Sequence, residues 1–168
     1  MSFVNRAARL RVPLGFVAGI AAVVLADPTR ASLIGGAAIA VLGEAIRIWA
    51  AGHLEKGREV TMSGPYRLTR HPLYLGSTLI GIGLAIASAN VWVTILVLGY
   101  LVVTLTAAIR TEEAHLTEKF GAAYPEYSAG RGPGVQRAFS LHRALRTNRE
   151  YRAALGVLVV LAVLALKL

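Results

Sequence analysis

The residues best suited to chemistry lie in two polar segments, 56–74 and 110–127, that flank a long apolar stretch. The first segment ends in a run of basic and aromatic residues, Arg70-His71-Pro72-Leu73-Tyr74. Pro72 predicts the start of a helix, because proline is favoured in the first helical turn, where its missing N–H is not needed. The free N–H groups and the positive dipole end at such a start favour a bound carboxylate or phosphate. Alternatively, the basic residues only anchor the helix among lipid headgroups.

The second segment opens with two adjacent carboxylates, Glu112 and Glu113, on the predicted continuation of an apolar helix. Carboxylates at the point where a helix leaves a membrane are costly to remove from water, so we expect them to have a cationic partner. Arg70, Arg110 or a positively charged ligand could supply that charge. The alternative is an ordinary solvated helix with charges spaced along it.

A hairpin should bring these two segments together. Residues 72–109 contain no charged side chain, and their 38 residues are about twice the length that one helix needs to cross a bilayer. Turn-forming residues at 88–90 predict a break, with helices over 72–88 and 91–109. If these helices run antiparallel, the start of one and the end of the other reach the same membrane face. A cofactor pocket could then be built from both polar segments.

The composition agrees with a membrane protein, since 55% of the 168 residues are hydrophobic and only 16% are charged. Further apolar stretches predict three more helices, over 12–26, 31–52 and 153–166. We therefore expect an all-α integral membrane bundle of about five transmembrane helices, forming a single domain over residues 1–168. Glu44 and Arg47 lie three residues apart on one helix face, and we interpret them as an internal ion pair that holds helices together.

The net charge of +9 could indicate a nucleic-acid partner, but the positions of the charges indicate membrane topology instead. With five crossings, 15 of the 18 Lys and Arg residues fall on one side. Because basic loops are retained in the cytoplasm, the amino terminus, the 53–71 loop and the 110–152 segment should be cytoplasmic. No nucleic-acid partner is expected. The absence of cysteine excludes thiolate chemistry, and the four scattered histidines predict no metal site.

Several short motifs follow one another along the chain: Gly64-Pro65-Tyr66, Arg70-His71-Pro72-Leu73-Tyr74-Leu75-Gly76, Glu112-Glu113-x-x-Leu116, Phe120-Gly121, Tyr124 and Tyr127. In order and approximate spacing, this pattern resembles the isoprenylcysteine carboxyl methyltransferase family and the related membrane phospholipid methyltransferases. The resemblance covers about 35–137. Segment 138–168 departs from it, with a basic stretch and a last apolar helix. Basic residues spaced about three apart predict a stripe on anionic headgroups: Arg143, Arg146, Arg149 and Arg152.

This resemblance implies that S-adenosylmethionine binds in a cytoplasmic pocket. By motif position, the cofactor-binding residues would be Val60, Thr61, Tyr66, His71, Pro72, Leu73, Tyr74 and Glu112. The resemblance also implies an arginine that holds a substrate carboxylate, for which Arg110 is the nearest candidate. If the acceptor is an amine, Glu113 is a candidate base that removes its proton.

The implied acceptor is amphiphilic or lipid-like, in contact with membrane lipids, and its nucleophile is left open. A carboxylate is already ionised at neutral pH, whereas an amine must lose a proton. Two other functions compete with methyl transfer: a sterol-type membrane reductase that holds NADPH in the same pocket, and a non-catalytic membrane scaffold. A soluble Rossmann-type methyltransferase is not supported, because the sequence contains no G-x-G-x-x-G fingerprint.

Overall fold

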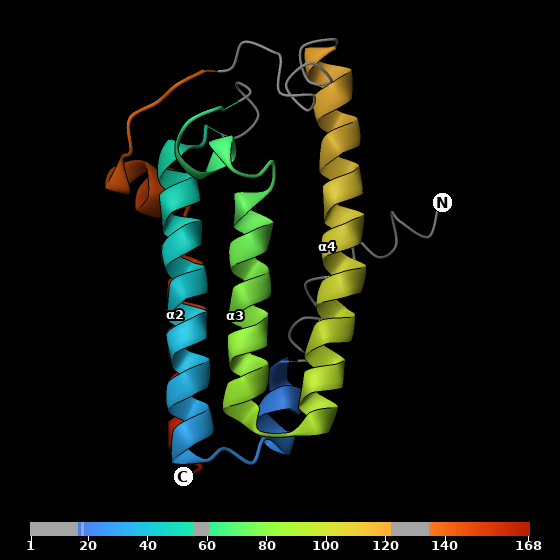
Figure 1. Cartoon of the computed structure of the whole chain (residues 1–168), viewed down its shortest axis with the longest axis vertical. Coiled ribbons are helices and arrows are strands. Elements are labelled where there is room, and N and C mark those ends of the chain that lie inside the picture. The colour runs from blue at the N-terminus through green and yellow to red at the C-terminus, as the bar shows by residue number, and fades with distance from the viewer. Residues whose placement is uncertain (1–16, 18, 56–60, 122–134) are drawn as a thin grey trace.

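The computed structural model describes residues 17, 19–55, 61–121 and 135–168, and these parts are helical, as predicted, with no strand among them. Residues 17 and 19–25 are helical, and the elements that follow are α2 (Arg30–His53), the short 3₁₀ turn η1 (Gly64–Arg67), α3 (Pro72–Ser88), α4 (Val91–Phe120), the π-helical turn η2 (Arg143–Thr147) and α6 (Tyr151–Ala165). Figure 1 shows α2, α3 and α4 side by side in alternating directions. The end of α2, the start of α3 and the end of α4 therefore lie together, at what we call the polar end.

The helices of the hairpin begin at residues suited to that place. Pro72 occupies the first turn of α3, and the helix ends at Ala89, whose φ of 50° breaks the helical path. The side chain of Asn90 then accepts hydrogen bonds from the N–H groups of Trp92 and Val93, at 2.9 and 3.3 Å, and so caps the start of α4. Helix α4 continues for 30 residues without a break, so both glutamates of the second polar segment lie on it.

Two of the described helices, α2 and α4, are long and apolar enough to cross a membrane, while α3 and α6 are shorter apolar helices. Large apolar side chains on α2, α4 and α6 are exposed, as a surface in contact with lipid tails requires, among them Ile34, Val41, Trp92, Val102, Leu155 and Leu158. Within the predicted helix over 12–26, residues 17 and 19–25 are helical, whereas 12–16 and 18 lie outside the described residues. A count of five transmembrane helices therefore stays a prediction.

Small residues allow α2 and α3 to lie in close contact. A methyl group added to Gly43 would lie only 2.6 Å from the carbonyl oxygen of Gly76 and 2.8 Å from the nitrogen of Ile80. A methyl group on Gly83 would lie 2.5 Å from the nitrogen of Ala40. Close approach of this kind stabilises helix pairs in a membrane, where burying apolar surface gives no advantage over lipid. Helix α3 is therefore held against α2 along its length.

The C-terminal segment, by which we mean residues 135–168, folds back onto the polar end of α2. Arg143 Nη1 donates to the carbonyl oxygen of Gly52 at 2.5 Å, and Asn148 Nδ2 donates to those of Ala51 and Leu54 at 2.8 and 2.9 Å. The last carbonyl groups of a helix have no partner within it, so this segment acts as the C-terminal cap of α2. Arg143 is half-buried in this role and does not belong to the exposed basic stripe predicted from the sequence.

The predicted pair of Glu44 and Arg47 is present but long, with 3.9 Å between Glu44 Oε2 and Arg47 Nε. A shorter ion pair joins Arg47 Nη2 to Glu150 Oε2 at 2.7 Å. At the opposite end of the bundle, Lys167 donates to the carbonyl oxygens of Val23 and Val24 at 2.9 and 3.1 Å. Helix α6 is thus fastened near both of its ends to other parts of the chain.

We expect Gly43→Ala to lower the free energy of unfolding by about 1–3 kcal/mol, because the added methyl group overlaps the backbone of α3. Gly35→Ala is the matched control, since a methyl group at Gly35 meets nothing within 4 Å. Unfolding by sodium dodecyl sulfate from mild detergent micelles would measure both. Equal stability of the two variants would show that α2 and α3 are not in backbone contact.

Candidate functional site

Two carboxylates of α4 meet the first turn of α3 at the polar end. Glu113 Oε1 lies 3.1 Å from His71 Nε2 and 3.5 Å from Arg70 Nη1. The Tyr74 hydroxyl donates a hydrogen bond to Glu112 Oε2 at 2.6 Å. The side chain of Glu113 is 33% exposed and that of His71 is 17% exposed, so this cluster is sheltered yet reachable from the outside. Arg70 supplies the positive charge that adjacent glutamates were expected to need.

The local sequence explains how these side chains come to face one another. His71 precedes a proline, which disfavours helical backbone, and it stands outside α3 with φ −128° and ψ 57°. Tyr74 follows three residues later on a nearby face, with its ring centroid 5.7 Å from that of His71. Neighbouring residues of a helix point in different directions, so Glu112 and Glu113 can each engage a different one of these two side chains.

The segment that leads into α3 is fastened to α2 and to the C-terminal segment. His53 Nδ1 lies 3.1 Å from Ser63 Oγ and 2.8 Å from the carbonyl oxygen of Arg137. The N–H of Met62 donates to the carbonyl oxygen of Val135 at 3.0 Å. Because His53 is the last residue of α2, these contacts fix the approach to His71 relative to the helix bundle.

An apolar groove of about 380 Å³ begins beside the cluster and runs between α3 and α4. His71 and Tyr74 form its polar end, and the rest of its lining is mostly apolar, with Leu75, Thr78, Leu98, Leu101, Val102, Leu105, Thr106 and Ile109. A hydrocarbon chain in this groove would place an attached polar group next to His71 and Tyr74.

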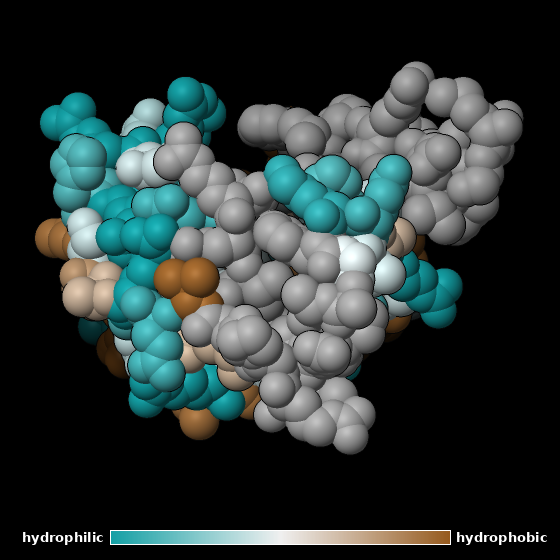
Figure 2. Space-filling view, turned by 90° about the horizontal axis from the view of Figure 1, so that it is seen from above, coloured by the Kyte–Doolittle hydropathy of each residue, from teal (hydrophilic) through white to brown (hydrophobic). Residues whose placement is uncertain are grey.

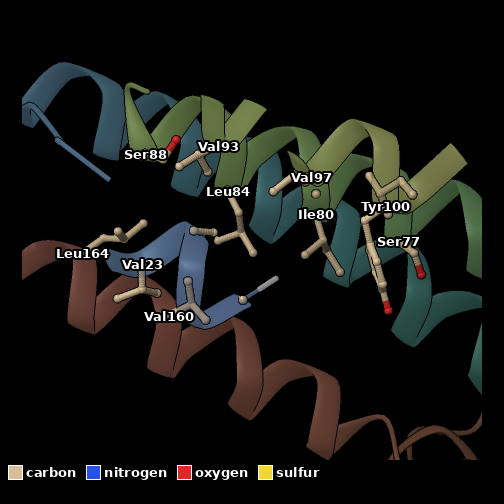
Figure 3. A pocket seen from close by; sticks show the side chains of 14 residues that line it. Val23, Ser77, Ile80, Leu84, Ser88, Val93, Val97, Tyr100, Val160 and Leu164 are labelled. Atoms are coloured by element: carbon tan, nitrogen blue, oxygen red, sulfur yellow. The ribbon is translucent and has the colours of Figure 1, made fainter. Parts of the chain in front are cut away.

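A second cavity, of about 220 Å³, is lined by other faces of α3 and α4 together with α6 and residues 19–23 (Figure 3). Leu101 contributes to the walls of both cavities and lies against Gly81 of α3. The hydroxyl groups of Ser77 and Ser88 at this cavity are already hydrogen-bonded within the protein. The cavity therefore presents mainly hydrocarbon, and it does not include any member of the polar cluster.

The polar end as a whole suits contact with water and headgroups. Viewed onto this end, Figure 2 shows hydrophilic side chains gathered over the described part of the surface. Arg67 is exposed here and donates to Gln136 Oε1 at 2.5 Å, and Arg70 is half exposed. Two exposed arginines, Arg67 and Arg70, thus lie at the same end of the bundle as the polar cluster.

Four of the residues predicted from the sequence come together in the cluster: His71, Tyr74, Glu112 and Glu113. Pro72 and Leu73 form the first turn of α3 between them. Tyr66 is half-buried on η1.

No hydrogen bond or ion pair among the described residues joins Thr61 or Arg110 to the cluster. Thr61 is buried in an isolated bridge with Val135, and its hydroxyl oxygen has no hydrogen-bond partner among the described residues. Arg110 is exposed on α4, so its role toward a substrate carboxylate stays a prediction. Val60, Tyr124 and Tyr127 lie outside the described residues.

The sequence did not predict the residues that hold the segment before His71 in place. His53, Ser63 and Arg137 join α2, the approach to α3 and the C-terminal segment, and up to 84 residues separate them. No local pattern of residues indicates such a contact. A histidine directly after a predicted helix was the only available signal, and it is a weak one.

Comparison with known proteins gives one family-model match and one curated relative above the threshold for significance. The family model described as phospholipid methyltransferase matches residues 17–123. The cobalt-zinc-cadmium resistance protein CzcN of Cupriavidus metallidurans is 33% identical over 116 residues, which cover 67% of this chain and 50% of that protein. This chain therefore spans about half the length of that relative. No solved structure matches.

The contact between Tyr74 and Glu112 can be measured by a double-mutant cycle with Tyr74→Phe and Glu112→Ala. We expect a coupling of about 1–3 kcal/mol in the free energy of unfolding, as for a hydrogen bond to a charged group. The control cycle pairs Tyr74→Phe with Glu118→Ala, an exposed glutamate on the same helix, and should give a coupling near zero. A value near zero in both cycles would contradict the contact.

Proposed function

Because this chain belongs to the phospholipid methyltransferase family, we propose that it transfers a methyl group from S-adenosylmethionine to an amphiphilic, lipid-like acceptor. One structural observation supports this proposal in addition to the family match. The cluster of His71, Tyr74, Glu112 and Glu113 lies at the polar end of an apolar groove between α3 and α4. A polar reaction centre thus adjoins a surface that suits a hydrocarbon chain.

The residues of the cluster fit the charged groups of this cofactor. Its ammonium and sulfonium groups are cations, and Glu112 and Glu113 are partly exposed carboxylates that could bind them. Its carboxylate is an anion, and the positive dipole end at the start of α3, with Arg70 beside it, favours an anion. Aromatic faces at Tyr66 and Tyr74 are suited to adenine or to the sulfonium. When bound, the cofactor supplies an electrophilic methyl group.

The protein's own contribution is mainly to position the reactants and to keep water away. Transfer from a sulfonium is an in-line displacement, so alignment of the acceptor with the methyl group accounts for much of the rate. The apolar walls of the groove would exclude water from the acceptor chain. If the acceptor is a carboxylate, Arg110 would orient it and no base is required. If it is an amine, Glu113 would take the proton, and its bond to His71 Nε2 would hold the carboxylate in place.

The proposed setting is a multi-pass membrane protein with its reaction centre toward the cytoplasm. The described polar end carries a concentration of Arg and Lys residues, whereas Arg30 and Lys167 lie at the opposite end. That asymmetry supports a cytoplasmic polar end, because positive loops are retained on the cytoplasmic side. Surrounding membrane lipids are the proposed source of the acceptor, within one domain that includes the C-terminal segment.

Binding of S-adenosylhomocysteine to the detergent-purified protein tests the cofactor assignment. We expect micromolar affinity by calorimetric titration, weakened about tenfold or more by His71→Ala and by Glu112→Gln, because each loses a contact with a charged group. Glu118→Gln, a change of the same kind at an exposed position of α4, should bind like the wild type. A folded wild-type protein that does not bind would overturn the proposal and favour a pocket for NADPH.

Blocking the groove tests where the acceptor binds. With a methyl-tritiated cofactor and total membrane lipid, we expect label in the organic phase, reduced about tenfold or more by Leu105→Trp, whose ring fills the groove. Val103→Trp is the matched control, because Val103 is 53% exposed on α4 and does not line the groove. Affinity for S-adenosylhomocysteine should stay within about twofold in both variants. Equal transfer by both would rule out the groove as the acceptor site.

A further inference from the structure

We propose that Arg47 and Glu150 are positioning residues for the reaction centre, and that the C-terminal segment thereby forms part of the catalytic unit. The expected effect of these two residues on cofactor binding rests on the proposed function. The structural part of the inference concerns how the first turn of α3 is held. Glu150 lies beyond residues 17–123, the range that the family model matches.

A chain of partly buried hydrogen bonds joins the C-terminal segment to α3. Glu150 Oε2 accepts from Arg47 Nη2 at 2.7 Å and from Arg47 Nε at 3.1 Å. The remaining nitrogen of this guanidinium, Nη1, donates to Ser77 Oγ at 2.5 Å. One arginine of α2 therefore holds a carboxylate of the C-terminal segment and a hydroxyl of α3 at the same time.

The chain continues into the reaction centre. Ser77 Oγ donates to the carbonyl oxygen of Leu73 at 2.9 Å. Leu73 lies between His71 and Tyr74, whose side chains meet Glu113 and Glu112 on α4. A shift of the first turn of α3 would displace both contacts together, so the orientation of Ser77 affects the geometry of the cluster.

The two charged groups of this chain are largely sheltered from water. The side chain of Glu150 is only 8% exposed and that of Arg47 is 20% exposed, so water competes little for either charge. The stem of Arg47 passes directly over Gly76, where an added methyl group would lie 2.5 Å from Arg47 Cγ. Arg47 therefore has little room to adopt another rotamer.

The position of Glu150 is itself determined by the preceding residues. Arg143 and Asn148 cap the end of α2 through the carbonyl oxygens of Gly52, Ala51 and Leu54. The N–H of Glu150 also donates to the carbonyl oxygen of Ala144 at 3.1 Å. These contacts of the C-terminal segment thus position the carboxylate of Glu150 beside Arg47.

A second carboxylate stands next to the same guanidinium. Both oxygens of Glu44 are buried and have no hydrogen-bond partner among the described residues, and Glu44 Oε2 is 3.9 Å from Arg47 Nε. Removing the charge of Glu150 would therefore leave Arg47 with a neighbouring counter-charge. Glu150→Gln consequently tests the contact with less risk of an isolated buried cation than most changes at a buried ion pair.

Ser77→Ala is the decisive variant, because it breaks the link between Arg47 and α3 without removing a charge. We expect amide hydrogen exchange in the first turn of α3 to rise about tenfold, measured by mass spectrometry in lipid nanodiscs. Affinity for S-adenosylhomocysteine should fall about tenfold, while the unfolding midpoint stays within a few degrees of the wild type. Ser77→Thr, which restores a hydroxyl, should recover both.

Thr104→Ala is the matched control, since Thr104 Oγ1 makes the same kind of bond, to the carbonyl oxygen of Tyr100 at 2.7 Å, and lies outside both cavities. It should change neither exchange in α3 nor affinity. Glu150→Gln should raise exchange in the same turn and provides the test if Ser77→Ala does not fold. Unchanged exchange in Ser77→Ala, or an equal change in Thr104→Ala, would overturn the proposal. If the wild type does not bind S-adenosylhomocysteine, the proposed function fails, and exchange alone decides the positioning role.

Discussion

Backbone contact between α2 and α3 is the constraint on which the rest of the structure depends. Lipid tails are as apolar as leucine, so helices in a membrane gain little by burying large side chains against each other. Here the missing side chains of Gly43, Gly76 and Gly83 let the two helices approach until their backbones touch. That contact fixes the height and rotation of α3. The residues at its start, His71 and Tyr74, are placed as a result.

The two sides of α3 are built differently, and the difference has a functional meaning. On the side toward α2, Gly76 and Gly83 allow backbone contact, whereas the side toward α4 borders both cavities. Helix α3 is therefore closely packed against α2 and loosely packed against α4. The polar cluster lies on the loosely packed side, where a ligand can enter without disturbing the contact that holds α3.

The helices of the hairpin could be predicted from the sequence, because short stretches of neighbouring residues determine where each helix begins and ends. An uncharged stretch of 38 residues with turn-forming residues at 88–90 predicts two helices, and α3 has the bounds predicted for the first. The proline after His71 and the paired glutamates predicted which side chains of the two polar segments could form a site. The contacts of Arg47 could be predicted only in part, because Glu44 is three residues away and Glu150 is 103 residues away. A partner that distant follows from the packing of the whole chain.

The internal partners of the two glutamates differ in how readily a ligand could replace them. Arg70 is half exposed and lies 3.5 Å from Glu113, so its ion pair is weakened by water and costs little to break. His71 and Tyr74 lie closer to the carboxylates and are more sheltered, and both lie at the start of α3, the helix that α2 holds in place. A cationic group arriving from the polar end would therefore displace Arg70 first and find both carboxylates still oriented by His71 and Tyr74. His71 and Tyr74 thus hold the two carboxylates in place independently of the more exposed contact with Arg70.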